Sequence, residues 1–341
     1  FEPGSTLKAF ILAAAIEEKI ANENSTYDCE NGRRKVGPKI IRDVHPYGIL
    51  TLAETLQYSS NICASKIGEK IGKENLYEYI MDFGFGRKLD VDLPGESSGK
   101  VQNLGNWGPV ELATISFGQG ISVTAIQLVN ALSTIANGGY QMQPYVVKSI
   151  VSPKGEIINE KKPKVIKRVI SYDTAEILKR MLRAVVEKGT GENAQISGYS
   201  IAGKTGTAQI PDTENGGYYA NKYIASFMGF APSDNPKLTL LVMLEDPKKS
   251  IYGGSTAAPI FKAITEKVLF YMGIPTEEEF LGNSLMPNLE GKSARDILRW
   301  AEEEGIKVSI KGNGYVIEQY PKPGETIKRG ADCKFKLSQD I

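Results

Sequence analysis

The spacing of apolar residues predicts a series of helices over the first 190 residues of the chain. Apolar positions recur every three or four residues over residues 6–22, 50–58, 62–72, 74–84, 122–139 and 173–188. A polar, turn-rich stretch covers residues 22–48, and residues 85–99 resemble a loop. Short strand-like pieces over residues 144–159 precede the last of these helices. We therefore expect helices joined by loops.

The pattern changes after residue 198. Three β-prone runs over residues 199–209, 222–231 and 237–246 are separated by turn residues, which indicates neighbouring antiparallel strands. A further helix is expected over residues 255–273. This order predicts a mixed α+β fold, in which an antiparallel sheet is flanked by helices.

The C-terminal part of the chain begins a second pattern. An amphipathic helix is followed by three short strand-like pieces, "IKVSI", "GYVIEQY" and "CKFKL". We predict a main domain over residues 1–275, an acidic linker over residues 276–283 and a small α+β module over residues 284–341.

Composition narrows the class of protein. The chain has 341 residues and 41 basic against 40 acidic side chains, so nothing suggests a surface for nucleic acid. Its longest apolar run, "AFILAAAI", is too short to span a bilayer. The chain lacks an initiator Met and a visible signal peptide, so we expect a piece of a longer protein with its targeting segment upstream.

Histidine and cysteine usage restricts the chemistry. The single histidine, His45, lies in a loop beside a proline, which disfavours a Ser-His-Asp triad. Cys29, Cys63 and Cys333 lack metal-ligand spacing, so neither a metal nor a cofactor is expected. A Cys29–Cys63 disulfide remains open, but two buried free thiols are favoured. A serine nucleophile in this chain would therefore take a lysine as its base.

The first candidate for such chemistry is Ser5 with Lys8, in "EPGSTLK". The two residues are one helical turn apart, on the same face of a mostly apolar helix. Ser5 could instead be only a helix cap. A second Ser-x-x-Lys match, Ser97 to Lys100, has no following helix to bring its two side chains together.

Two further motifs could complete a site. Ser59 and Asn61, in "SSN" between two predicted helices, offer a proton carrier and an orienting amide, although a helix cap would look the same. In "GKTGTAQ", Lys204 offers a positive charge, and Thr205 and Thr207 offer hydroxyls for a carboxylate. Gly206 would leave space for the backbone of another molecule, unless the segment is only a glycine-kinked edge strand.

Two other motif matches fail on their context. Residues 198–205 fit the phosphate-binding pattern G-x-x-x-x-G-K-[ST], but the required buried strand before it and helix after it are not predicted. The tripeptide "SDN", at residues 233–235, lies between two prolines and is interpreted as a turn.

Ser-x-x-Lys, Ser-x-Asn and Lys-Thr-Gly in this order are the motif set of β-lactamases and penicillin-binding proteins. Together with "FGFGRKLDVDLPGESSG" and "ISFGQGISVTAIQLVNALSTIANGG", they make the chain resemble the transpeptidase domain of class B penicillin-binding proteins. The tail, from "MPNLEGKSARDILRWAEEEG" to "QYPKPGETIKRG", resembles a PASTA module. Family members carry further sheet strands, a non-catalytic domain and usually a membrane anchor before the Ser-x-x-Lys helix, and these would lie upstream.

The resemblance implies a mechanism and a role for each motif residue. Ser5 would be the acylated nucleophile, Lys8 its base, and backbone N–H groups of Ser5 and Thr207 the oxyanion donors. Ser59 would carry the proton and Asn61 would orient Lys8. Lys204 would be the catalytic cation that favours a neutral Lys8. Thr205 and Thr207 would hold the terminal carboxylate of a D-Ala-D-Ala stem peptide, and Gly206 would belong to the same substrate-binding strand. An amine of a neighbouring stem peptide would then resolve the acyl-enzyme.

The resemblance also implies partners and location. β-Lactam antibiotics would acylate the serine, and a glycosyltransferase with other division or sporulation proteins would be partners. The site would lie at the extracytoplasmic face of the bacterial membrane. The alternative is a β-lactam-sensing or β-lactamase-like protein. The PASTA module could bind peptidoglycan or act as a spacer, and the sequence does not decide between these.

Overall fold

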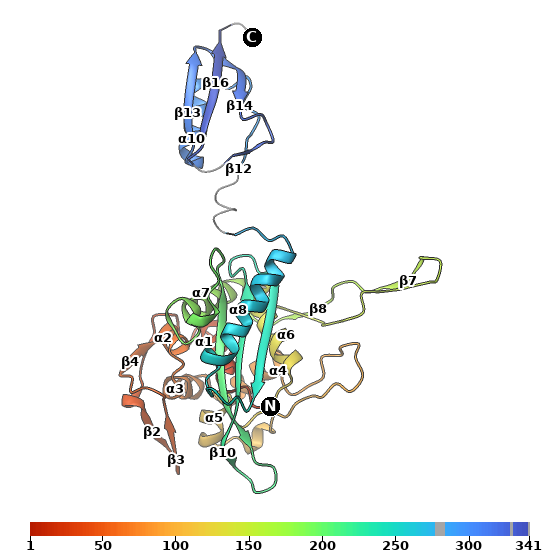
Figure 1. The fold of residues 1–341 in the computed structure, drawn as a ribbon. Helices are drawn as coiled ribbons and strands as arrows, with labels where there is room; N and C mark the ends of the chain where they lie inside the picture. The colour runs from red at the N-terminus through yellow and green to blue at the C-terminus, as the bar shows by residue number, and fades with distance from the viewer. Residues whose placement is uncertain (277–283, 328–329, 340–341) are drawn as a thin grey trace. The chain divides into compact units, whose positions relative to one another are not determined.

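A computed structural model describes residues 1–276, 284–327 and 330–339. The chain forms two compact units, Phe1–Val268 and Leu269–Ile341 (Figure 1). Apart from residue 276, the predicted linker over residues 276–283 lies outside the described residues. Among the described helices, none combines the length and the apolar character that crossing a membrane requires.

The helices of the main unit follow the predicted order, although most are shorter than predicted. They are α1 (Lys8–Glu17), α2 (Leu52–Gln57), α3 (Asn61–Ile71), α4 (Lys73–Asp82), α5 (Pro109–Ile115), α6 (Ala125–Ala136), α7 (Tyr172–Lys188) and α8 (Gly253–Tyr271), with the 3-10 turns η1 (Gly4–Leu7), η2 (Glu30–Gly32), η3 (Leu104–Asn106) and η4 (Glu192–Ala194). Helix α5 was not predicted, because its seven residues are too few to show a helical period.

The predicted antiparallel sheet is present. Strands β9 (Ala202–Pro211), β10 (Tyr218–Ala231) and β11 (Leu238–Glu245) pair in the order β11-β10-β9. Figure 1 shows α8 lying across this sheet, where Phe261 of α8 meets Phe227 of β10 with ring centroids 4.7 Å apart. The alternate side chains of β10, Met228 and Phe230, join the main apolar core instead. The mixed α+β prediction is confirmed.

Helix α1 runs through the centre of the main unit. Every residue from Lys8 to Ile16 is buried, and α1 contacts α3, α4 and α7. The 3-10 turn before it packs on β9, where Gly4 has a φ of +58° and where an added Cβ would lie 3.1 Å from the carbonyl oxygen of Thr207. A left-handed conformation and this close approach both favour glycine. Together they hold the start of α1 against β9.

Residues 22–48 are more ordered than the predicted turn-rich stretch. They contain the antiparallel pair β2 (Arg33–Val36) and β3 (Lys39–Arg42), and strand β1 (Thr26–Asp28), which pairs with β4 (Ile49–Thr51). These strands are only three or four residues long, so apolar alternation could not reveal them, and residues 50–51 of β4 fell within the helix predicted over residues 50–58. Arg34 fixes β2 to α3 by hydrogen bonds to Ser65 and Glu69 at 2.8 and 2.7 Å.

The predicted strand-like pieces near residues 144–159 form a two-stranded arm. Strands β6 (Ser149–Val151) and β7 (Ile157–Glu160) pair with each other, and β8 (Val165–Arg168) returns to pair with β5 (Tyr140–Met142). In Figure 1 this arm extends away from the rest of the main unit. Asp92 holds its base by accepting hydrogen bonds from the backbone of Val146 and Val147.

The second unit contains the predicted helix and three strands. Helix α10 (Ala294–Glu304) precedes β13 (Lys307–Gly312), β14 (Tyr315–Tyr320) and β16 (Asp332–Ser338). Strand β16 is central, parallel to β13 and antiparallel to β14. A short pair that was not predicted, β12 (Ser284–Leu285) and β15 (Thr326–Ile327), completes the unit. Its own apolar core includes Met286, Ile297 and Phe335.

Candidate active site

A cleft of about 600 Å³ in the main unit brings the three sequence motifs together. Ser5 lies in η1, Ser59 and Asn61 lie at the start of α3, and Thr205 and Thr207 lie on β9; all five line the cleft. Its other lining residues come from the loop before β4, the end of α2, the loop after α5, the segment after α7 and the residues around the start of α8. They include His45, Tyr58, Gln119, Thr190, Glu192, Asn193 and Tyr252.

Lys8 Nζ lies at the meeting point of the first two motifs. It is 3.1 Å from Ser5 Oγ, 2.6 Å from the Ser59 carbonyl oxygen, 3.1 Å from Ser59 Oγ and 2.7 Å from Asn61 Oδ1. The helical turn predicted from the Ser-x-x-Lys spacing therefore places the amine against the candidate nucleophile. Lys8 is 0 % exposed, so water does not compete for these contacts.

The hydrogen-bond partners of Lys8 Nζ allow the amine to act as a base. The two carbonyl-type oxygens, from Ser59 and Asn61, can only accept, and they make the two shortest contacts. A neutral amine has two N–H groups, which these oxygens use. Its single lone pair can then accept from one hydroxyl at a time, that of Ser5 or that of Ser59, each 3.1 Å away. This arrangement suits removal of a proton from a serine hydroxyl.

The electrostatic environment favours the neutral form of this amine. Burial lowers the pKa of Lys8 to about 7, although the Asp43 carboxylate opposes this shift. Lys204 is also 0 % exposed. Burial first, and then repulsion from Lys8, hold the pKa of Lys204 well below its ordinary value. The two buried lysines therefore disfavour each other's protonation.

The turn before α3 is built to present Ser59 and Asn61. Ser59 has a φ of +63°, a left-handed conformation that costs a non-glycine residue about 1–2 kcal/mol. The next residue, Ser60, caps α3 by accepting a hydrogen bond from the Cys63 N–H. Asp43 accepts hydrogen bonds from the Asn61 N–H at 2.5 Å and from the Ile62 N–H at 3.1 Å. Such local strain, held by surrounding contacts, is typical of active sites.

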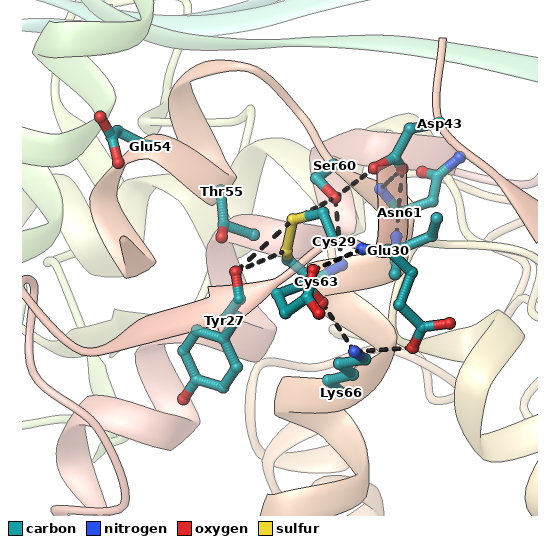
Figure 2. The surroundings of a disulfide bond; sticks show 12 residues. Tyr27, Cys29, Glu30, Asp43, Glu54, Thr55, Ser60, Asn61, Cys63 and Lys66 are labelled. Carbon is teal, nitrogen blue, oxygen red and sulfur yellow. Dashed lines mark hydrogen bonds and ion pairs between the residues drawn. A yellow bond between two sulfur atoms is a disulfide. The ribbon is translucent and has the colours of Figure 1, made fainter. Parts of the chain in front are cut away.

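A disulfide joins Cys29 to Cys63, so the expectation of two buried free thiols is wrong. Figure 2 shows the bond beside Ser60 and Asn61, between the end of β1 and the first turn of α3. The Ser60 hydroxyl donates to Asp43 at 2.5 Å and lies 3.3 Å from Cys29 Sγ. The sequence could not show this pairing, because 34 positions separate the two cysteines and only the fold brings them together. Cys333, in the other unit, is a buried free thiol.

Alternation along β9 divides the third motif between two faces. Thr205 and Thr207 point into the cleft, whereas Lys204 and Gly206 lie on the other face. A Cβ on Gly206 would lie 2.3 Å from Ser226 Oγ and 3.2 Å from the carbonyl oxygen of Pro3. The missing side chain thus accommodates this chain's own η1 turn, not the backbone of another molecule as predicted.

Two residues that the sequence did not single out hold the motif residues in place. Thr190 Oγ1 lies 2.8 Å from Thr205 Oγ1, and Asp43 fixes Asn61 through the backbone contacts described above. Thr190 follows α7 in "EKGTGEN", where the paired glycines signal a tight turn but not its proximity to β9. Asp43 lies in the stretch predicted to be only turns.

The other catalytic or binding motifs considered from the sequence lie in local structures that do not suit those roles. His45 lines the cleft, but its ring stacks edge-on with Tyr47, and Lys8 supplies the amine in contact with Ser5. Residues 202–205 of the apparent phosphate-binding match are β-strand, so that loop and its helix do not form. Residues 233–235 lie in the turn between β10 and β11, and Ser97 to Lys100 have no helix, both as predicted.

Comparison with known proteins identifies this arrangement. Residues 1–266 match the family described as penicillin binding protein transpeptidase domain, and residues 284–339 match the PASTA domain. The chain belongs to the penicillin-binding protein transpeptidase family and carries a PASTA domain, so the resemblance seen in the sequence is confirmed.

Individual relatives agree with this assignment. Stage V sporulation protein D of Bacillus subtilis is 37% identical over 353 residues, covering 100% of this chain and 54% of the relative. Penicillin-binding protein PbpB of Mycolicibacterium smegmatis is 36% identical over 286 residues, covering 81% of this chain and 44% of the relative. This chain thus spans about half the length of these relatives.

Solved structures share the fold. The transpeptidase domain of Burkholderia pseudomallei penicillin-binding protein 3 superposes with a TM-score of 0.73 at 32% identity, covering 81% of each chain. Penicillin-binding protein 3 of Mycobacterium tuberculosis, solved in complex with aztreonam, gives a TM-score of 0.75 at 33% identity, covering 81% of this chain and 64% of the other.

Proposed function

We propose that this protein is a serine D,D-transpeptidase that crosslinks the stem peptides of peptidoglycan. One observation carries the proposal: a fully buried Lys8 amine touches the hydroxyls of Ser5 and Ser59 and the amide of Asn61. A serine hydroxyl needs such a base to become a nucleophile near neutral pH. The family membership and the relatives named as D,D-transpeptidases support the same conclusion.

In the first step, Ser5 Oγ attacks the carbonyl carbon of the penultimate D-alanine of a donor peptide. Its proton passes to Lys8 Nζ, 3.1 Å away. The backbone N–H groups of Ser5 and Thr207 stabilise the negative charge on the carbonyl oxygen, a contribution typically worth about 10²–10³ in rate per donor. The C–N bond then breaks, and the proton travels through Ser59 to the departing amine of D-alanine.

In the second step, the amine of a neighbouring stem peptide attacks the ester carbonyl on Ser5. A C–N bond forms, the bond from carbon to Ser5 Oγ breaks, and the nitrogen's proton returns to Ser5 through Lys8. A β-lactam undergoes the first step alone, because its ring-opened amine stays attached and blocks the approach of an acceptor. We therefore propose β-lactams as covalent inhibitors.

The terminal carboxylate of the donor binds at β9. Thr205 and Thr207 direct hydroxyls into the cleft, and Lys204 lies behind them with its Nζ 3.2 Å from Thr205 Oγ1. Two hydroxyl donors and the amine of Lys204 form a suitable site for a carboxylate. Burial and Lys8 hold the pKa of Lys204 low, and the negative charge of a bound carboxylate would raise it, which favours a protonated Lys204 beside a neutral Lys8.

We propose that the protein acts at the extracytoplasmic face of the bacterial membrane, with a glycosyltransferase and other division or sporulation proteins as partners. The Cys29–Cys63 disulfide supports an oxidising compartment, which is where such bonds persist. The proposed domain limits are residues 1–275 for the transpeptidase domain, 276–283 for the linker and 284–341 for the PASTA domain.

The proposed activity can be tested with a peptide that ends in D-Ala-D-Ala and a second peptide that carries a free amine. The protein should release free D-alanine and form a joined product, and Ser5→Ala should do neither. Ser255→Ala removes another hydroxyl that lines the cleft, at the start of α8, and should retain most of the activity. D-Alanine release by Ser5→Ala at the rate of the unchanged protein would contradict the proposal.

A further inference from the structure

Among the described residues that line the cleft, Glu192 supplies the one carboxylate. Its side chain is exposed, and within the described chain it takes part in no ion pair. The two lysines of the site lie below the cleft at 0 % exposure. Of these three charged groups, Glu192 is therefore the one that an approaching molecule meets at the rim.

The backbone around Glu192 is fixed to the walls of the cleft. Thr190, two residues before it, contacts Thr205 of β9 at 2.8 Å through the two hydroxyls. Asn193, the next residue, donates from Nδ2 to the Gly254 carbonyl oxygen at the start of α8, also at 2.8 Å. Glu192 itself begins the 3-10 turn η4. Its position near the Thr205 end of the cleft is thus set by contacts on both sides.

The Thr205 end is also where the acceptor nitrogen must bind. Aminolysis of the acyl-enzyme by a stem-peptide amine has the same bond changes as the reverse of acylation, with the new amine in place of that of D-alanine. The acceptor nitrogen must therefore occupy the position that the D-alanine nitrogen leaves. That position lies between Ser5 and the proposed carboxylate site at Thr205 and Thr207. Glu192 lines the same cleft, on the segment that Thr190 ties to Thr205.

We propose that Glu192 selects acceptors that approach as cations, by pairing its carboxylate with the acceptor ammonium. This inference rests on the proposed transpeptidase function. An amine is protonated at neutral pH, so a rim carboxylate raises its local concentration. The ammonium then loses its proton to water, and the neutral nitrogen attacks the ester as described above. Glu192 acts in binding, and Lys8 remains the base.

The test measures how the acyl-enzyme divides between water and an amine. The whole chain is given a D-Ala-D-Ala peptide and increasing amounts of a peptide with a free lysine side-chain amine, and hydrolysed and joined products are quantified. Because the ratio is set after acylation, a change in the acylation rate cancels. The variants are Glu192→Gln and Glu192→Lys. Glu160→Gln, on β7 of the exposed arm, is the matched control.

We expect Glu192→Gln to need roughly two- to fivefold more cationic acceptor for the same product ratio, because exposed ion pairs contribute at most about a fivefold effect. Glu192→Lys should need more still, and added salt should reduce both differences. Hydroxylamine is an acceptor that is mostly uncharged at neutral pH. The acyl-enzyme should therefore react with water and with hydroxylamine in the same ratio in all variants.

Two results would overturn the inference, and they are distinguishable. If every variant gives the same ratio of hydrolysed to joined product with the cationic acceptor as the unchanged protein, Glu192 has no role in acceptor selection, while the transpeptidase function stands. If the unchanged protein is acylated but joins no amine, the proposed function fails and the inference fails with it. An equal loss of hydroxylamine and cationic acceptor in Glu192→Gln would show a structural effect, and would also reject selection by charge.

Discussion

Replacing Lys8 with methionine should slow acylation of Ser5 by a β-lactam by about 10²–10⁴-fold, the usual contribution of a positioned base. Methionine fills a similar volume but cannot accept a proton. The amine it removes is in contact with Ser5 Oγ at 3.1 Å. The measurement is the second-order rate constant of acylation, followed by intact mass.

The pH dependence of acylation should also identify Lys8 as the base. Only neutral Lys8 can take the serine proton, and burial lowers its pKa to about 7. The rate should therefore fall about tenfold for each pH unit below that pKa and level off above it. A lysine with an ordinary pKa would not give this pH–rate profile, because it stays protonated well above neutral pH.

Controls separate loss of the base from loss of the fold. Methionine at position 8 leaves the Ser59 carbonyl and the Asn61 amide without their donor, so the melting temperature must be measured alongside the rate. Lys154→Met, at the tip of the exposed arm, should change neither quantity. A folded Lys8→Met protein that is acylated at the unchanged rate would mean that another group is the base.

Opening the Cys29–Cys63 disulfide should lower the free energy of unfolding of the main unit by roughly 3–4 kcal/mol. The bond closes a loop of 34 positions in the unfolded chain, and loops of this length lose that much conformational freedom in the chain-entropy description. Both cysteines are fully buried, so the effect is best measured as a shift of the denaturant midpoint with and without reductant.

Two variants make this result specific. A protein with both Cys29→Ala and Cys63→Ala should resemble the reduced protein, and reductant should then have no further effect. Cys333→Ala should leave the response of the main unit to reductant unchanged, since Cys333 is a free thiol of the other unit. A denaturant midpoint that does not move when the disulfide is reduced would contradict the prediction.

The local part of the site could be predicted from sequence. Ser5 and Lys8 meet because a helical turn brings positions three apart to one face, and the strand carrying Lys204 to Thr207 follows from its β-prone neighbours. The order of the three motifs then identified the family. These features depend on short-range periodicity, which the chain itself displays.

Contacts between distant segments could not be predicted. The disulfide, the Asp43 contacts to α3 and the Thr190–Thr205 contact each join segments that no periodicity relates. The short strands β1 to β4 were missed because three or four residues carry too little pattern. Gly206 lies on the predicted strand, but Ser226 and η1 fill the space beside it, which the sequence does not show.

The central claim is that Ser5 is a nucleophile activated by Lys8. Intact mass after incubation with a penicillin, followed by peptide mapping, tests it most directly. We expect a single covalent adduct on the peptide that contains Ser5, and no adduct in Ser5→Ala. An adduct on a different residue, or one that persists in Ser5→Ala, would contradict it.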